Sequence, residues 1–139
     1  MVIAPSGEIA ATYRKVHLFD VDVEHGPADT ESARVTAGDA PTCVDIDGVR
    51  LGLTICYDLR FPELYRKLAS LGAEVITIPA AFTLFTGKDH WEVLVRARAI
   101  ENLAYVIAPA QVGRHSANRQ TFGNAMIVDP WSVVLARCA

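Results

Sequence analysis

The segment Gly-Leu-Thr-Ile-Cys-Tyr-Asp-Leu-Arg-Phe-Pro-Glu-Leu (52–64) places a cysteine between an apolar strand and the start of a helix. A thiol at such a turn, here Cys56, is held at the edge of the sheet. The adjacent helix N-terminus offers free N–H groups and a positive partial charge, which favour a thiolate or an oxyanion. Most free cysteines are instead small buried hydrophobic residues, and this segment alone leaves both interpretations open.

Helical and strand patterns alternate after this turn. Pro62 suits the first turn of a helix, and Gly72 is a natural residue at its end. Asp89 is a suitable N-cap for a second helix. The apolar side of that second helix would comprise Trp91, Leu94, Val95, Ala99, Ile100 and Leu103. We expect a helix over 62–71, a strand over 74–79, a loop over 80–87, a helix over 90–103 and a strand over 105–112.

Turn signals indicate hairpins at both ends of the chain. Asp47-Gly48 is a strong two-residue hairpin signal between strands over 42–46 and 49–55. The turn residues at 5–7 join two further strands, over 1–4 and 8–13. The remaining expected segments are a polar loop over 20–40, a polar loop over 113–121, and a last hairpin that pairs 124–128 with 133–137.

The order of these elements predicts an α/β fold. The strands around 51–55, 75–79 and 105–110 are apolar without clean alternation, which is typical of strands covered on both faces. Two helices cannot cover so much sheet, so either a second sheet packs on it or the covering material lies outside this chain. Because the chain also ends within a strand pattern, we expect it to be part of a larger fold.

Composition excludes several classes of protein. The 139 residues suffice for one domain, and 51% hydrophobic with 21% charged residues is typical of a folded protein. A net charge of −3 argues against binding to nucleic acid or to an anionic membrane, and no apolar run is long enough to span a bilayer. Three irregularly spaced cysteines indicate a reducing, cytoplasmic compartment, and four scattered histidines make a metal site unexpected.

Two charged residues elsewhere in the chain complement the thiol. Lys15 lies in Tyr-Arg-Lys-Val-His-Leu-Phe-Asp (13–20), and Glu31 lies in the long polar stretch. A cysteine that opens an amide needs oxyanion donors and a base, and an ammonium group beside the thiol would lower its pKa and bind the oxyanion. Taken singly, however, a lysine or a glutamate is most often a solvated surface charge.

Together these segments closely resemble the carbon–nitrogen hydrolase (nitrilase) superfamily, over essentially the whole chain. The nearest branch is the Nit group of small amidases. The matching motifs are Tyr-Arg-Lys-Val-His-Leu-Phe-Asp (13–20), Ile-Cys-Tyr-Asp-Leu-Arg-Phe-Pro-Glu-Leu (55–64), His-Trp-Glu-Val-Leu-Val-Arg-Ala-Arg-Ala-Ile-Glu-Asn (90–102) and Met-Ile-Val-Asp-Pro-Trp (126–131).

The resemblance implies an α-β-β-α sandwich and a Glu–Lys–Cys catalytic set. By motif, Cys56 is the nucleophile, and Lys15 and the backbone N–H of Tyr57 contact the oxyanion. Glu31 matches a glutamate that orients the lysine or the reacting group, and Phe82 falls where relatives line the substrate pocket.

The same resemblance implies a reaction. The expected substrate is a small linear amide, such as deaminated glutathione or the ω-amide of an α-keto acid, and hydrolysis proceeds through a thioester without metal or cofactor. The expected assembly is a homo-oligomer, a dimer or larger. Nitrile hydrolysis remains an alternative, whereas a redox thiol protein would need a resolving cysteine near Cys56, and Cys43 lies at no motif spacing from it.

Departures from the family pattern leave a second function open. The general-base glutamate of the family lies upstream of the lysine motif and has no match here, and family chains are about twice as long. We therefore expect an incomplete domain over residues 1–139, without the N-terminal part and the last strand. A catalytically incompetent fragment or pseudoenzyme with only an assembly role is the alternative. Ser132 also replaces a glycine of the Nit group, which makes its turn less permissive.

Overall fold

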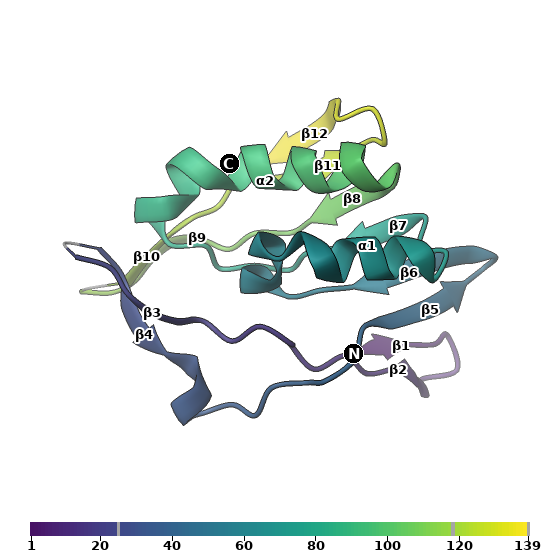
Figure 1. Cartoon of the computed structure of the whole chain (residues 1–139), viewed down its shortest axis with the longest axis horizontal. Helices are drawn as coiled ribbons and strands as arrows, with labels where there is room; N and C mark the ends of the chain where they lie inside the picture. Colours follow the sequence, from purple (N-terminus) through teal and green to yellow (C-terminus); the bar gives the residue numbers. More distant parts are fainter. Residues whose placement is uncertain (25, 118, 139) are drawn as a thin grey trace.

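A six-stranded sheet, in the order β12-β11-β8-β7-β6-β5, forms the centre of the protein (Figure 1). The computed structural model describes residues 1–24, 26–117 and 119–138. Strands β6, β7 and β8 are mutually parallel, and the remaining pairs in this sheet are antiparallel. The strand bounds are β5 (Thr42–Ile46), β6 (Val49–Leu53), β7 (Val75–Thr77), β8 (Tyr105–Ala108), β11 (Ala125–Val128) and β12 (Val134–Cys138).

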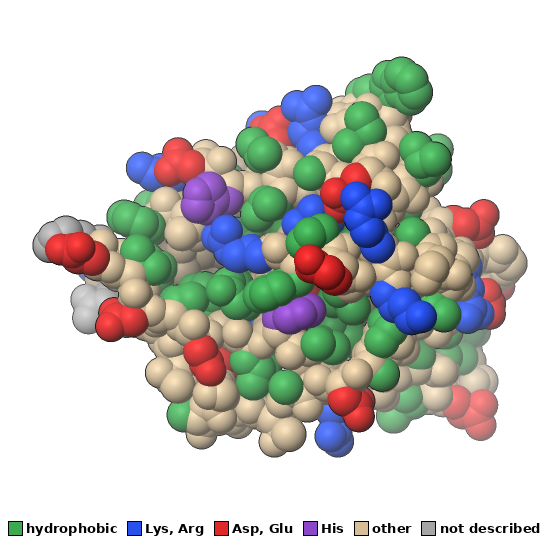
Figure 2. Space-filling view, viewed as in Figure 1, with side chains coloured by type: hydrophobic (Ala, Val, Ile, Leu, Met, Phe, Trp, Pro, Cys, Tyr) green, Lys and Arg blue, Asp and Glu red, His purple; other side chains and the backbone are tan. Residues whose placement is uncertain are grey.

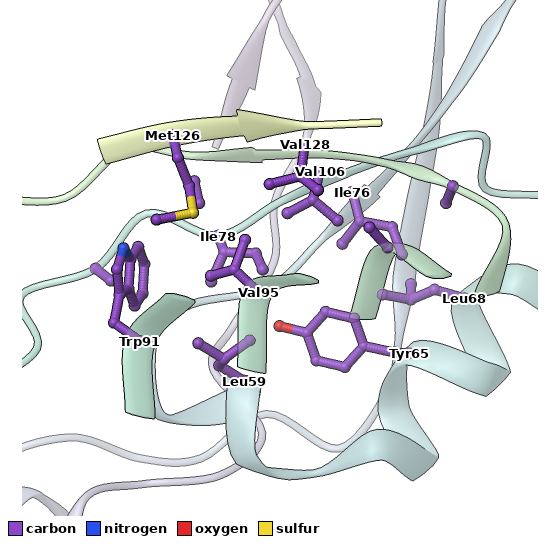
Figure 3. Packing of buried hydrophobic residues seen from close by; sticks show 14 of the residues in the cluster. Leu59, Tyr65, Leu68, Ile76, Ile78, Trp91, Val95, Val106, Met126 and Val128 are labelled. Atoms are coloured by element: carbon purple, nitrogen blue, oxygen red, sulfur yellow. The ribbon is translucent and has the colours of Figure 1, made fainter. Parts of the chain in front are cut away.

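Two α-helices lie beside each other on one face of this sheet (Figure 1). They are α1 (Pro62–Ser70), which begins at the proline as predicted, and α2 (Leu84–Asn102). The core fills the space between the helices and the sheet (Figure 3), where burial of each large apolar side chain contributes about 1.5–3 kcal/mol. Its fully buried members include Leu59, Tyr65, Leu68, Ile76, Ile78, Trp91, Val95, Val106 and Val128.

The opposite face of the sheet remains exposed over β8 and its neighbours. Along β8, Val106 and Ala108 are buried under the helices, whereas Tyr105 is 47% and Ile107 is 41% exposed. Of the two alternatives that the sequence left open, a second sheet formed by the described residues does not cover this part of the sheet. Burial alternates along β8, as in any strand with one covered face. The sequence does not show this alternation because the exposed positions also carry apolar side chains.

Helix α2 begins six residues earlier than predicted. Its N-cap is Thr83, whose side chain accepts a hydrogen bond from the Thr86 N–H, so Asp89 does not cap it. The predicted loop over 80–87 thus ends in a helical turn. At the other end, Leu103 adopts a left-handed conformation with φ of 51° and is exposed, and Ile100 is half-exposed. These two residues therefore do not belong to the buried side of the helix.

The segment predicted as a polar loop over 113–121 instead forms an antiparallel hairpin of β9 (Val112–Ser116) and β10 (Arg119–Phe122). Backbone hydrogen bonds join the two strands. Thr121 is the only residue of these two strands that is buried. Its hydroxyl contacts His115 Nε2 at 2.7 Å. Because almost all of the hairpin is exposed, its sequence carries no apolar alternation that would predict strands.

The other predicted hairpins are present. Strands β5 and β6 pair around the Asp47-Gly48 turn, and β1 (Val2–Ile3) pairs with β2 (Ile9–Ala11). The polar stretch over 20–40 contains a short hairpin of β3 (Asp20–Asp22) and β4 (Ala28–Thr30), followed by the 3₁₀-helix η1 (Glu31–Ala33).

Both signs of charge are interspersed over the helix side of the molecule (Figure 2). This distribution leaves no continuous basic field on that face. Among the described residues, no helix combines the length and apolarity needed to cross a bilayer. The three cysteines Cys43, Cys56 and Cys138 are free thiols in this structure.

Candidate active site

Cys56 stands at a sharp turn beyond the end of β6. The 3₁₀-helix η2 (Cys56–Arg60) begins at this residue, and the backbone of Cys56 is left-handed, with φ of 49°. This conformation costs a non-glycine residue about 1–2 kcal/mol. The Cys56 N–H donates to the carbonyl of Pro79 beyond β7, at 2.9 Å. The turn therefore lies at the carboxyl ends of the parallel strands, where open α/β sheets bind ligands.

Arg98 ties this turn to α2. Its buried guanidinium donates from Nε to the carbonyl of Leu59 at 3.0 Å and pairs with Glu101 at 2.7 Å. The same guanidinium lies 5.3 Å from the ring centroid of Tyr65. Because a buried charge is tolerated only with such partners, the contacts of Arg98 fix η2 against the core.

One open cavity of about 1370 Å³ brings all five predicted site residues together. They come from four separate parts of the chain: the segment after β2, the helix η1, the turn after β6 and the segment after β7. The five residues are Lys15, Glu31, Cys56, Tyr57 and Phe82.

Lys15 and Glu31 form a close ion pair in this cavity. Lys15 is only 8% exposed, and its Nζ lies 2.5 Å from Glu31 Oε2. The same oxygen accepts the backbone N–H of Phe19 at 2.6 Å, which fixes the carboxylate from a second side. Lys15 Nζ also lies 6.0 Å from the ring centroid of Tyr57. This geometry suits a glutamate that orients the lysine.

Burial raises the pKa of the Cys56 thiol. A hydrogen bond from the Ala81 backbone N–H and the charge of Lys15 act in the opposite direction, but they do not offset the loss of solvent. The pKa of Cys56 is therefore shifted toward the protonated thiol, whereas the helix N-terminus in the sequence suggested a thiolate. A nucleophile in this state needs a base to take its proton.

Ala81 was not predicted from the sequence. It contributes only a backbone N–H, and its side chain carries no chemical signal. It follows the residue pair Pro79 and Ala80, whose backbone groups bond to Cys56 and to Pro109, respectively. The contact of Ala81 with the thiol thus depends on the positions of two parallel strands.

Cationic and aromatic side chains form another wall of the cavity. The guanidinium of Arg60 lies 5.4 Å from the ring centroid of Phe82 and 6.0 Å from that of Tyr57. Phe82 in turn packs on Trp91, with ring centroids 5.0 Å apart. Three more cations, Arg34, Lys88 and Arg119, also line the cavity. Asp29 also lines the cavity and pairs with Arg34 at 2.6 Å, so one of these charges is already neutralised. Arg60 beside its two aromatic neighbours suits a ligand that carries negative charge next to an apolar portion.

Comparison with known proteins identifies the family of the chain. The family model for carbon-nitrogen hydrolases matches residues 1–139. The deaminated glutathione amidase of Synechocystis sp. is 59% identical over 137 residues, which cover 97% of this chain and 50% of that protein. The chain thus spans about half the length of the curated relatives it matches.

Two solved structures share the fold. The NitFhit protein of C. elegans superposes with a TM-score of 0.91 at 48% identity, over 99% of this chain and 34% of that one. A variant of the amidase from Nesterenkonia sp. AN1 has a TM-score of 0.80 at 30% identity, over 96% of this chain and 49% of the other. That structure shows Michael addition of acrylamide at the active-site cysteine of the amidase.

Proposed function

The chain belongs to the carbon–nitrogen hydrolase family, and we propose that its site hydrolyses the C–N bond of a small amide through a thioester on Cys56. The observation that carries the proposal is the meeting of Cys56, Lys15 and Glu31 in one cavity, with Lys15 paired to Glu31 at 2.5 Å. These residues are distant in sequence, and each has the chemistry that one step of acyl transfer needs.

The first half of the reaction forms the thioester. The sulfur of Cys56 attacks the carbonyl carbon, its proton passes to a base, and the carbonyl electron pair moves onto oxygen. Lys15 Nζ and the N–H of Tyr57, in the first turn of η2, stabilise this oxyanion. When the carbonyl re-forms, the C–N bond breaks and the nitrogen leaves, after protonation, as ammonia or an amine.

Water completes the cycle by attacking the thioester. It forms the carboxylic acid product and returns the thiol, again through an oxyanion held by the same donors. The first half needs a base because burial keeps the pKa of the Cys56 thiol high. The second half needs one because the attacking water must lose a proton. In the family pattern this base is a glutamate that precedes the lysine motif. The chemistry proposed for these residues needs no metal or cofactor in either half.

The cationic wall supports an anionic amide as the substrate class. Deaminated glutathione and the ω-amides of α-keto acids both carry carboxylates, and the guanidinium of Arg60 can offer charge-assisted hydrogen bonds to such a group. We propose that Phe82 packs against the carbon chain of the substrate. By analogy with the family, we also propose that the protein works in the cytoplasm as a homo-oligomer.

A pair of variants tests the proposal in the protein expressed from its complete reading frame. With deaminated glutathione as substrate, Cys56→Ala should abolish amide cleavage, and Cys43→Ala, a matched thiol outside the cavity, should leave it unchanged. Mass spectrometry of the quenched reaction should detect the acyl group on Cys56. Equal cleavage rates in the Cys56→Ala variant and the parent would contradict the proposal.

A second candidate is a chain that binds the amide without turning it over. Two observations favour it: the pKa of Cys56 is raised, and Glu31 Oε2 already accepts from Lys15 and from Phe19. Without a base, the loss would be about 10²–10⁴-fold. Parent-like turnover of the amide by the 139-residue chain alone would overturn this second candidate.

A further inference from the structure

A fully buried carboxylate, Asp58, lies two residues after Cys56 and accepts four hydrogen bonds. Its Oδ1 accepts the backbone N–H of His17 at 3.0 Å and contacts His17 Nδ1 at 2.9 Å. Its Oδ2 accepts the hydroxyl of Tyr13 at 2.8 Å and the backbone N–H of Ile55 at 2.9 Å. Each of these partners belongs to the segment that carries Lys15 or to the segment that carries Cys56.

The partners of Asp58 bracket the two residues that must meet. Tyr13 and His17 lie two residues before and two residues after Lys15, and Ile55 immediately precedes Cys56. We infer that Asp58 is a positioning residue that fixes Lys15 relative to the thiol of Cys56 for amide hydrolysis. The inference rests on the proposed function, and it concerns a residue that does not line the cavity itself.

The hydrogen-bond pattern requires a carboxylate at this position. Each oxygen of Asp58 accepts a backbone N–H, one from His17 and the other from Ile55. An asparagine places an NH₂ group against one of these N–H groups whichever way its amide is turned, because the amide has a single acceptor oxygen. A buried donor left without an acceptor is costly. The variant would therefore lose the contact either with the His17 segment or with the Ile55 segment.

Two further contacts hold the Lys15 segment against η2. The Tyr13 hydroxyl accepts the backbone N–H of Val16 at 3.2 Å, so one phenol oxygen bonds both Asp58 and the residue next to Lys15. Burial and the adjacent carboxylate raise the pKa of Tyr13, which keeps the phenol protonated as a donor. The ring of His17 stacks on Phe61, at the far end of η2, with centroids 3.8 Å apart and an interplanar angle of 6°.

A purely electrostatic role for Asp58 has the wrong sign. The negative charge of Asp58 raises the pKa of the Cys56 thiol, while the charge of Lys15 lowers it. Removal of the carboxylate charge would therefore favour the thiolate, if the geometry were kept. A loss of activity on its removal has to come from displacement of Lys15 or of the turn.

Asp58→Asn and Tyr13→Phe test the inference in the protein expressed from its complete reading frame. We expect Asp58→Asn to lower kcat for amide hydrolysis by about 10-fold to 100-fold, the scale of a small displacement of a catalytic group. KM should change by less than about twofold, because Asp58 does not touch the substrate. Tyr13→Phe, which removes two of the hydrogen bonds and no charge, should lower kcat in the same direction by less.

Tyr65→Phe is the matched control for Tyr13→Phe. Tyr65 is also buried, and its hydroxyl contacts Thr54 Oγ1 at 3.0 Å rather than Asp58. Tyr65→Phe should lower the melting temperature without lowering kcat in the folded enzyme. If Asp58→Asn does not fold, the comparison of Tyr13→Phe with Tyr65→Phe still decides the inference, and equal kcat values in those two variants would overturn it.

A double-mutant cycle with Lys15→Met supplies a readout that general destabilisation does not move. The rate of alkylation of Cys56 by iodoacetamide should fall on Lys15→Met in the parent and change little in the Asp58→Asn background, because Lys15 is then no longer held near the thiol. Additive effects would overturn the positioning role. This cycle needs no turnover, so a parent without amidase activity would sink the proposed function and still leave Asp58 tested.

Discussion

The backbone N–H of Gly38 donates to the carbonyl of Lys15 at 2.9 Å, so the two chain segments touch through their main chains. A Cβ at Gly38 would lie 2.3 Å from the carbonyl oxygen of Arg14. Backbone atoms cannot swing aside as a flexible side chain does. We predict that Gly38→Ala displaces the Lys15 segment, lowers kcat by tenfold or more, about the cost of a small misplacement of a catalytic group, and changes KM little.

Gly48→Ala is the control for that prediction. Gly48 has φ of 83° and open space around it in the β5–β6 turn, far in sequence from Lys15. The substitution should destabilise the protein by about 1 kcal/mol through backbone strain alone, seen as a lower melting temperature, and leave kcat unchanged. A Gly38→Ala variant with parent kcat would show that the Lys15 segment tolerates the shift.

Arg60 should select for anionic amides. Its guanidinium lines the cavity against two aromatic rings, and a hydrogen bond to a substrate carboxylate is worth about 1.5–3 kcal/mol. Arg60→Gln should therefore raise KM for an anionic amide by about 10-fold to 100-fold and leave KM for a neutral amide such as butyramide nearly unchanged. Arg66→Gln, at an exposed arginine of α1 outside the cavity, should affect neither substrate. An equal rise for both substrates would contradict a carboxylate contact.

The reactivity of Cys56 should depend on pH in a direction set by its burial. Because its pKa is raised and only the thiolate is nucleophilic, alkylation by iodoacetamide should keep rising through the pH range where an ordinary thiol has already ionised. Lys15→Met removes a charge that lowers this pKa, so the curve should move to still higher pH. Peptide mass spectrometry separates Cys56 from exposed Cys138, the internal reference. A shift to lower pH would contradict the assigned electrostatics.

Local signals account for the parts of the fold that were predicted. Asp47-Gly48 adopts the two left-handed conformations that its hairpin requires, with φ of 48° and 83°. Pro62 begins α1, and Gly72, with φ of 85°, follows its C-cap. The candidate site was predicted by motif resemblance rather than by local physics, and its five residues converge on one cavity.

What escaped prediction depends on contacts between distant segments. Asp58 takes two of its partners, Tyr13 and His17, from 45 and 41 residues away, so its position two residues after the cysteine gave no hint of them. Ala81 acts through its backbone alone. The β9–β10 hairpin is held by backbone pairing of polar residues, and the start of α2 depends on the cap at Thr83. Pattern and propensity contain none of this information.

Ser132 should limit the stability of the last hairpin. It adopts φ of 71°, a left-handed conformation that costs a residue with a Cβ about 1–2 kcal/mol. Its carbonyl accepts Arg96 Nε at 3.0 Å, and its hydroxyl contacts the same nitrogen at 3.2 Å. Ser132→Gly removes only the hydroxyl contact and relieves the strain, so we expect about 0.5–1 kcal/mol of added stability in urea unfolding. Ser132→Ala loses the hydroxyl and keeps the Cβ, and should be less stable than the parent. If Ser132→Gly and Ser132→Ala were equally stable, the strain at this turn would be negligible.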